Sequence, residues 1–113
     1  MSTEISVAIV GVGSIGSYLV QAIRDGSAGA TRVSAIADRS EMVPRLREVA
    51  CQNRCAWTTD PLSVLHHEPS IVIEAAGPHV VREYAIPLLE RGANVFVMSA
   101  GALAEAAFLS QVQ

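Results

Sequence analysis

An apolar run that leads into three spaced glycines constrains the fold of this chain more than any other feature. Residues 5–10 have the length and composition of a buried strand, and Gly-x-Gly-x-x-Gly follows at once over residues 11–16. Residues 18–23 then repeat apolar side chains at the spacing of an amphipathic helix. Strand, glycine loop and helix in this order predict a dinucleotide-binding turn, whereas the three glycines alone would equally suit an ordinary loop.

Each glycine has a separate physical role in such a turn. Gly11 permits the sharp turn after the strand, and Gly13 lets the backbone approach a pyrophosphate. Gly16 lets the helix pack closely on the sheet. The first turn of the helix offers free N–H groups and the positive end of its dipole to the same pyrophosphate.

An acidic residue at the end of the next expected strand, residues 32–38, extends the pattern. Asp38 follows Gly16 by 22 residues, a spacing that suits a carboxylate bound to a ribose hydroxyl. The alternative is a helix N-cap or a turn at the strand end. Arg39 provides a guanidinium that suits a 2′-phosphate, so the sequence favours NAD and leaves NADP open.

Composition narrows the remaining classes. The 113 residues are 50% hydrophobic and 17% charged, with a net charge of −3, which is typical of one globular domain. All basic residues are scattered arginines, so we expect neither a nucleic-acid partner nor lysine-based catalysis. No signal peptide or membrane-length apolar run is visible, and Cys51 and Cys55 read as free thiols of a cytoplasmic protein rather than metal ligands.

Strand-like and helix-like segments alternate along the whole chain. This order predicts an α/β fold, a Rossmann-type doubly wound parallel sheet in a single domain, with its ligand site at the carboxyl ends of the strands. Ser40 is the expected N-cap of the second helix. Besides the segments above, we expect strands at 56–58, 71–77 and 94–98, and helices at 14–24, from Ser40 through Val49, from Pro78 to Gly92, and at 102–113.

Three polar residues in the second half have two interpretations each. Glu74 is the one charge in an apolar strand, and either backbone N–H groups hold it or it lies near the nicotinamide. His79 begins a helix and lines the cofactor groove, or acts as a general acid. Ser99 binds the nicotinamide amide or turns the chain.

Two segments resemble parts of the aspartate dehydrogenases. The glycine loop at residues 11–16 and Asp38-Arg39 also fit this family, so the resemblance covers nearly all of the chain. Val72-Ile-Glu-Ala-Ala-Gly-Pro-His-Val-Val-Arg-Glu-Tyr84 is similar to the family's strand end and its "V-x-E-Y" helix. Residues 97–104 (Val-Met-Ser-Ala-Gly-Ala-Leu-Ala) are similar to its "V-M-S-x-G-A-L-A" segment. Ala75 stands where the family commonly has cysteine.

The resemblance implies an NAD(P)-dependent dehydrogenase that oxidises L-aspartate at its CH–NH2 group. The iminoaspartate formed hydrolyses to oxaloacetate and ammonia or feeds NAD biosynthesis. Family members continue into a second domain that binds aspartate and supplies the catalytic histidine. We therefore expect residues 1–113 to be the dinucleotide-binding half, which binds cofactor without turnover and has no catalytic residue or metal ligand of its own.

The expected cofactor contacts follow from the motif and the resemblance together. We expect the pyrophosphate to contact Gly11, Gly13, Ser14, Ile15 and Gly16. We expect the adenosine ribose to contact Asp38 and Arg39. We expect the nicotinamide half to contact Ala75, Ala76, Gly77, Pro78, His79, Ser99 and Ala100. Two alternatives stay open: a related oxidoreductase of the homoserine dehydrogenase or dihydrodipicolinate reductase type, and a stand-alone nucleotide-binding module. A surface left by a missing half would favour a homo-oligomer.

Overall fold

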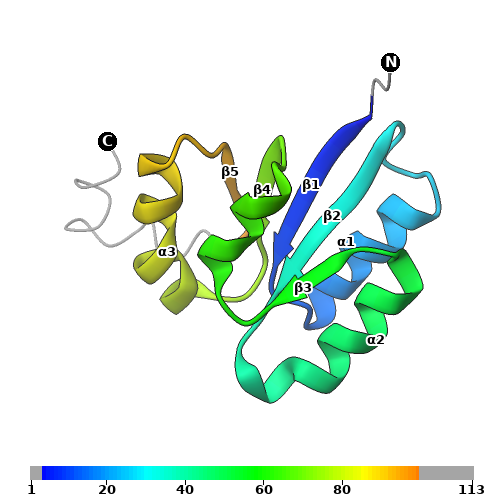
Figure 1. The fold of residues 1–113 in the computed structure, drawn as a ribbon, viewed down its shortest axis with the longest axis horizontal. Helices are drawn as coiled ribbons and strands as arrows, with labels where there is room; N and C mark the ends of the chain where they lie inside the picture. The colour runs from blue at the N-terminus through cyan, green and yellow to red at the C-terminus, as the bar shows by residue number, and fades with distance from the viewer. Residues whose placement is uncertain (1–3, 100–113) are drawn as a thin grey trace.

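Five parallel strands form the centre of the computed structural model, which describes residues 4–99. Their order across the sheet is β3-β2-β1-β4-β5, so the strand order reverses at β1 (Figure 1). This confirms the expected doubly wound parallel sheet. The strands are β1 (Ile5–Val10), β2 (Thr31–Ala37), β3 (Ala56–Thr58), β4 (Ile71–Glu74) and β5 (Val95–Val97).

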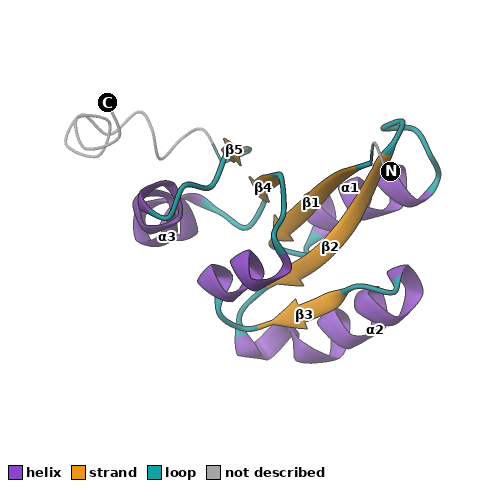
Figure 2. Ribbon diagram, turned by 45° about the horizontal axis from the view of Figure 1, so that its top comes forward, coloured by secondary structure: helices purple, strands orange, loops and turns teal. Residues whose placement is uncertain are grey.

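Helices cover both faces of the sheet. Figure 2 shows α1 and α2 on one side of the strands and α3 on the other. The 3-10 helix η2 shares the α3 side, where its Val64 packs in one core cluster with Leu88 of α3. The helical elements are α1 (Ser14–Arg24), η1 (Ser40–Met42), α2 (Val43–Asn53), η2 (Pro61–His67) and α3 (Pro78–Glu90).

One row of side chains shows how far α1 and α2 reach across the sheet. Ile36, Ile9, Ile73 and Phe96 are neighbours on successive strands from β2 to β5. Ile36 and Ile9 are 0% exposed, Ile73 is half-buried and Phe96 is 61% exposed. On this face α1 and α2 therefore bury the side chains of β1 and β2, whereas that of Phe96 in β5 is left exposed.

The expected N-cap at Ser40 was wrong. Ser40 is the first residue of η1, and α2 begins three residues later at Val43. In a helix capped by Ser40, the Ser40 carbonyl would accept its hydrogen bond from the N–H of residue 44. Residue 44 is proline, which has no N–H, so the α-helix begins where Pro44 falls in its first turn.

The fourth strand ends earlier than the apolar pattern predicts. β4 stops at Glu74, because the Glu74 side chain takes the N–H groups of Ala76 and Gly77 at 2.8 and 2.7 Å. The backbone then turns through Gly77, whose φ of +146° favours glycine. The helix expected at 102–113 lies outside the described residues.

Candidate functional site

A cavity of about 490 Å³ opens at the carboxyl ends of the strands. We call it the central cavity, since it lies where the strand order reverses between β1 and its neighbours. Loops that follow β1, β2, β3 and β4 and the first turns of α3 surround it. Its lining residues are Val10, Gly11, Gly13, Asp38, Arg39, Glu41, Met42, Thr59, Pro61, Ala75, Ala76, His79, Val80, Glu83 and Tyr84.

Two of the loop glycines are required by the protein's own packing. Gly11 has a φ of +104°, and a Cβ there would lie 2.7 Å from the backbone of Ala75 and Ala76. A Cβ on Gly16 would overlap the carbonyl oxygen of Gly11. The β1 turn therefore sits directly against the loop after β4 and under the first turn of α1, as expected for a fingerprint of this kind.

Gly13 is different, because nothing in the protein occupies the place of its missing side chain. Its φ is −72°, a value open to any residue, and no atom lies within 4 Å of the position that a Cβ would take. Gly13 also lines the central cavity and stands just before α1, where it occupies the N-cap position. The glycine here leaves free space at a helix N-terminus, which is where a pyrophosphate binds.

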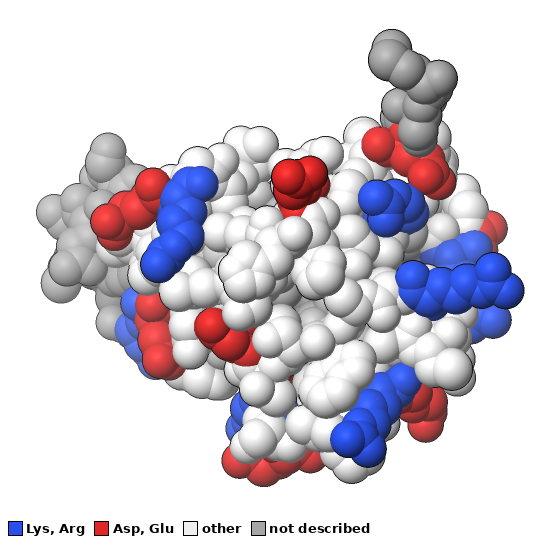
Figure 3. Space-filling view, viewed as in Figure 1, with Lys and Arg blue, Asp and Glu red and all other residues white. Residues whose placement is uncertain are grey.

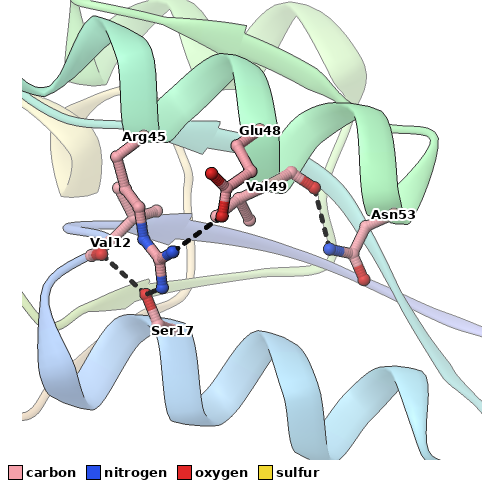
Figure 4. Close-up of polar contacts among 6 residues, drawn as sticks. All are labelled: Val12, Ser17, Arg45, Glu48, Val49 and Asn53. Atoms are coloured by element: carbon pink, nitrogen blue, oxygen red, sulfur yellow. Dashed lines mark hydrogen bonds and ion pairs between the residues drawn. The ribbon is translucent and has the colours of Figure 1, made fainter.

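Side chains form hydrogen bonds with both backbone polar groups of Val12, its N–H and its carbonyl. The N–H of Val12 donates to Asp38 Oδ2 at 2.8 Å, and its carbonyl accepts from the Ser17 hydroxyl at 2.7 Å. Arg45 of α2 donates to that same hydroxyl at 2.9 Å and to Glu48 at 3.0 Å (Figure 4). The glycine loop is thus fixed from β2 on one side and from α1 and α2 on the other.

Asp38 keeps lone pairs for a ligand in spite of these bonds. Its Oδ1 accepts from the Arg39 N–H at 2.8 Å, so each carboxylate oxygen has one bond to the protein. The side chain lines the central cavity beside Arg39. A carboxylate held from behind by two N–H groups is well oriented to accept hydroxyl hydrogens from a ribose.

Glu74 is a buried carboxylate that joins the loops after β4 and β5. It is 4% exposed, and besides the N–H groups of Ala76 and Gly77 it accepts from the Ser99 N–H at 2.9 Å and the Ser99 hydroxyl at 2.8 Å. The backbone-held interpretation of Glu74 is confirmed. Ser99 turns toward Glu74 and not into the cavity, so its hydroxyl hydrogen is already engaged.

The structure gathers half of the expected contact residues on the central cavity. Gly11, Gly13, Asp38, Arg39, Ala75, Ala76 and His79 line it, whereas Ser14, Ile15, Gly16, Gly77, Pro78 and Ser99 do not. Several of the latter are direct neighbours of lining residues in the chain. Ala100 lies outside the described residues.

Sequence reasoning missed the lining residues that come from beyond the strand ends. Glu83 and Tyr84 follow His79 by about one helical turn on α3, so a helical projection from His79 would have found them. Thr59 follows β3 directly, and the carboxyl-end rule points to it. Burial, followed by the neighbouring Glu83 carboxylate, raises the pKa of Tyr84 above its usual value, so its phenol keeps its proton at neutral pH and can donate a hydrogen bond.

Outside the central cavity, the surface carries charges of both signs. On the face drawn in Figure 3, arginines and acidic residues lie around an uncharged area, and acidic side chains stand near the arginines on the right of the view. Residues 4–99 contain no group of three or more His, Cys, Asp or Glu side chains arranged to hold a metal ion. Cys51 and Cys55 are free thiols. In the same range no helix is long and apolar enough to span a membrane.

A family model identifies what this arrangement belongs to. The model described as "Homoserine dehydrogenase, NAD binding domain" matches residues 11–112. The chain belongs to this family. It is an NAD-binding domain, and a nicotinamide dinucleotide is its ligand class.

Curated relatives of this NAD-binding domain carry the name L-aspartate dehydrogenase. The protein from Methanocella arvoryzae is 35% identical over 108 residues, which cover 95% of this chain and 38% of the relative. The protein from Archaeoglobus fulgidus is 29% identical over 108 residues, with 95% and 39% covered. The chain thus spans about two fifths of the length of these relatives, and the expected resemblance is confirmed.

A solved structure supports the fold independently. A probable dehydrogenase from Thermotoga maritima superposes with a TM-score of 0.80 at 19% identity, over 95% of this chain and 31% of that one. At this identity the likeness concerns the fold alone. This chain therefore shares its fold with about a third of that protein.

Proposed function

We propose that this chain is the cofactor-binding part of an L-aspartate dehydrogenase and that it binds NAD in the central cavity. One observation carries the binding site: Gly13 leaves open space at the N-terminus of α1, on the cavity wall, that the protein itself does not use. The names of the relatives support the substrate. The dinucleotide-binding domain spans residues 1–113 in this proposal, and the aspartate-binding domain belongs to sequence beyond them.

The dinucleotide would cross β1 with its pyrophosphate on the glycine loop. N–H groups at the start of α1 face that point, and the helix dipole favours the negative charge. Asp38 would accept the ribose hydroxyls of the adenosine half. The nicotinamide half would lie toward Ala75, Ala76 and His79, on the β4 side.

The proposed reaction oxidises L-aspartate at Cα to an imine that hydrolyses to oxaloacetate and ammonia, and a nicotinamide held beside Ala75, Ala76 and His79 would supply the hydride acceptor. The residues of this chain orient the cofactor and exclude water from the backbone side. The Glu74 carboxylate fixes the loop that carries Ala75 and Ala76, so it sets the floor of the nicotinamide half. We assign no proton transfer to the described residues and expect binding without turnover.

Calorimetric titration of the 113-residue chain tests the proposal. We expect NAD and NADH to bind one to one and Gly13→Ala to bind them far more weakly, while circular dichroism shows both proteins equally folded. A folded wild-type chain that binds neither nucleotide would refute it. For the reaction, a longer polypeptide that contains this chain should reduce NAD with L-aspartate and not with L-homoserine.

A further inference from the structure

The corner of the central cavity where β2 ends holds two carboxylates and one guanidinium. Asp38, Arg39 and Glu41 all line the cavity there. Arg39 Nε lies 3.4 Å from Glu41 Oε2, and both side chains are 71% exposed. The formal charge of the three side chains is −1, whereas Asp38 and Arg39 alone would sum to zero.

Two of the donors that Arg39 would offer to a phosphate, its backbone N–H and its Nε, face carboxylates instead. A 2′-phosphate on the adenosine ribose is bound by a guanidinium and by nearby backbone N–H groups. The Arg39 N–H donates to Asp38 Oδ1 at 2.8 Å, and the guanidinium edge that carries Nε is directed to Glu41. A ribose with a free 2′-hydroxyl needs neither donor, since Asp38 accepts from it.

We propose that Glu41 is a specificity-determining residue, which makes this site select NAD over NADP by engaging the guanidinium of Arg39. The inference rests on the proposed cofactor site. An exposed ion pair contributes little to stability, so its removal should leave the fold intact and affect ligand binding alone. In water-like surroundings a guanidinium about 5 Å from a doubly charged phosphate strengthens its binding by roughly tenfold, so a guanidinium held by Glu41 withholds about this much from NADP.

Other charged groups on the cavity wall do not offset this arrangement. Glu83, His79 and Tyr84 also line the cavity, but they belong to α3, which follows β4 on the far side of β1 from β2. Among the described lining residues, Arg39 is the one permanent cation. Its engagement by Glu41 therefore determines whether a cationic group is available to a 2′-phosphate.

The test measures dissociation constants of NAD and NADP for four proteins. These are the wild-type chain, Glu41→Gln, the double variant Arg39→Ala/Glu41→Gln, and Glu90→Gln as a control with the same charge change at an exposed residue outside the cavity. We expect the wild type to prefer NAD by at least about tenfold. Glu41→Gln should raise NADP affinity about five- to tenfold, and the double variant should lose this gain.

The outcomes separate the inference from the proposed function. An unchanged ratio of the two constants in Glu41→Gln, or a wild type that prefers NADP, overturns the role of Glu41. The same holds if the gain persists without Arg39, because Glu41 would then not act through it. A shift of the same size in Glu90→Gln also overturns it, since net charge alone would be responsible. A chain that binds neither nucleotide refutes the cofactor site itself.

Discussion

Asp38 Oδ2 and the Val12 N–H form a 2.8 Å hydrogen bond that joins the end of β2 to the glycine loop across 26 residues of sequence. The acid expected to bind the ribose therefore has a second task, because it also shapes the loop expected to bind the pyrophosphate. Both halves of the fingerprint depend on one carboxylate. Its removal should affect the two ends of the adenosine diphosphate moiety together.

Asp38→Ala should weaken NAD binding by about 1–3 kcal/mol, since the ribose and Val12 both lose a polar partner. Asp38→Asn separates the two tasks, because an amide oxygen still accepts from Val12 while the negative charge is lost. We expect Asn to lie between Ala and the wild type in calorimetric titrations with NAD and with ADP-ribose. Equal affinity of all three proteins would contradict a role for Asp38 in binding.

Gly13 and Gly16 should respond differently to the same added methyl group. Gly16→Ala would force a Cβ onto the Gly11 carbonyl and should prevent folding or cost several kcal/mol. Gly13→Ala meets no atom and should change stability by about 1 kcal/mol or less, because alanine restricts the unfolded chain but is a poorer N-cap than glycine. Urea unfolding monitored by circular dichroism measures both, and a large loss of stability in Gly13→Ala would refute this distinction.

Ser17 should contribute to affinity through the loop, although it does not line the cavity. Ser17→Ala removes the hydroxyl between the Val12 carbonyl and Arg45, and we expect NAD binding to weaken about three- to tenfold. Arg45→Ala should have a smaller effect, and a double-mutant cycle should show coupling of about 0.5–1.5 kcal/mol.

Asn53→Ala is the matched control for this network. Asn53 lies on the same helix and donates to the Val49 carbonyl at 2.8 Å, without contact to the glycine loop (Figure 4). It should change stability and leave the NAD dissociation constant within about twofold. Equal losses of affinity in Asn53→Ala and Arg45→Ala would indicate a general effect of α2 on folding.

Glu74→Gln should destabilise the protein by about 2–3 kcal/mol, because an amide group replaces an oxygen that accepts from buried donors. Ser99→Ala removes a single side-chain bond and should cost about 1 kcal/mol. Urea unfolding measures both values, with the exposed Glu90→Gln as control. A Glu74→Gln variant within about 0.5 kcal/mol of wild type would show that the buried charge is not needed.

The two cysteines should differ in reactivity. Burial raises the pKa of the Cys55 thiol from 9.0 to about 11, which lowers its thiolate fraction at pH 8 about 100-fold. The greater nucleophilicity of a more basic thiolate restores part of this, so we expect modification about tenfold slower than for an unshifted thiol. Iodoacetamide labelling of Cys51→Ser and Cys55→Ser variants measures each rate, and equal rates would contradict burial of Cys55.

The same shift gives a sign for the pH dependence of stability. The folded protein holds the Cys55 proton more tightly than the unfolded chain, so its contribution is complete below about pH 9. It is lost as the pH rises toward 11. Cys55→Ser should remove this part of the alkaline loss of stability.

The fold was predictable because its signals are local. The glycine loop between an apolar strand and a helix is read directly along the chain, and α1 has the bounds Ser14–Arg24 that the sequence indicates. The backbone-held role of Glu74 also followed from a lone charge at a strand end. The residue type of Ser40 predicts a cap, but Pro44 has no N–H for the Ser40 carbonyl, and this favours the later start of α2.

The second layer of the site was not predictable in the same way. Arg45 reaches Ser17 across 28 residues, and Ser99 reaches Glu74 across 25. Contacts of this range depend on how helices and strand ends are placed in space, and no spacing rule in the sequence encodes them. Glu41 is close to Arg39 in sequence, but its place on the cavity wall appears only once η1 turns the chain.

The empty space beside Gly13 means that folding does not protect this position. An alanine there would cost little stability, so selection for expression, solubility or thermal resistance would not remove it. Only a demand for ligand can keep the glycine in place over many generations. In variants selected for stability alone, substitution of Gly13 would therefore abolish ligand binding before the fold changed.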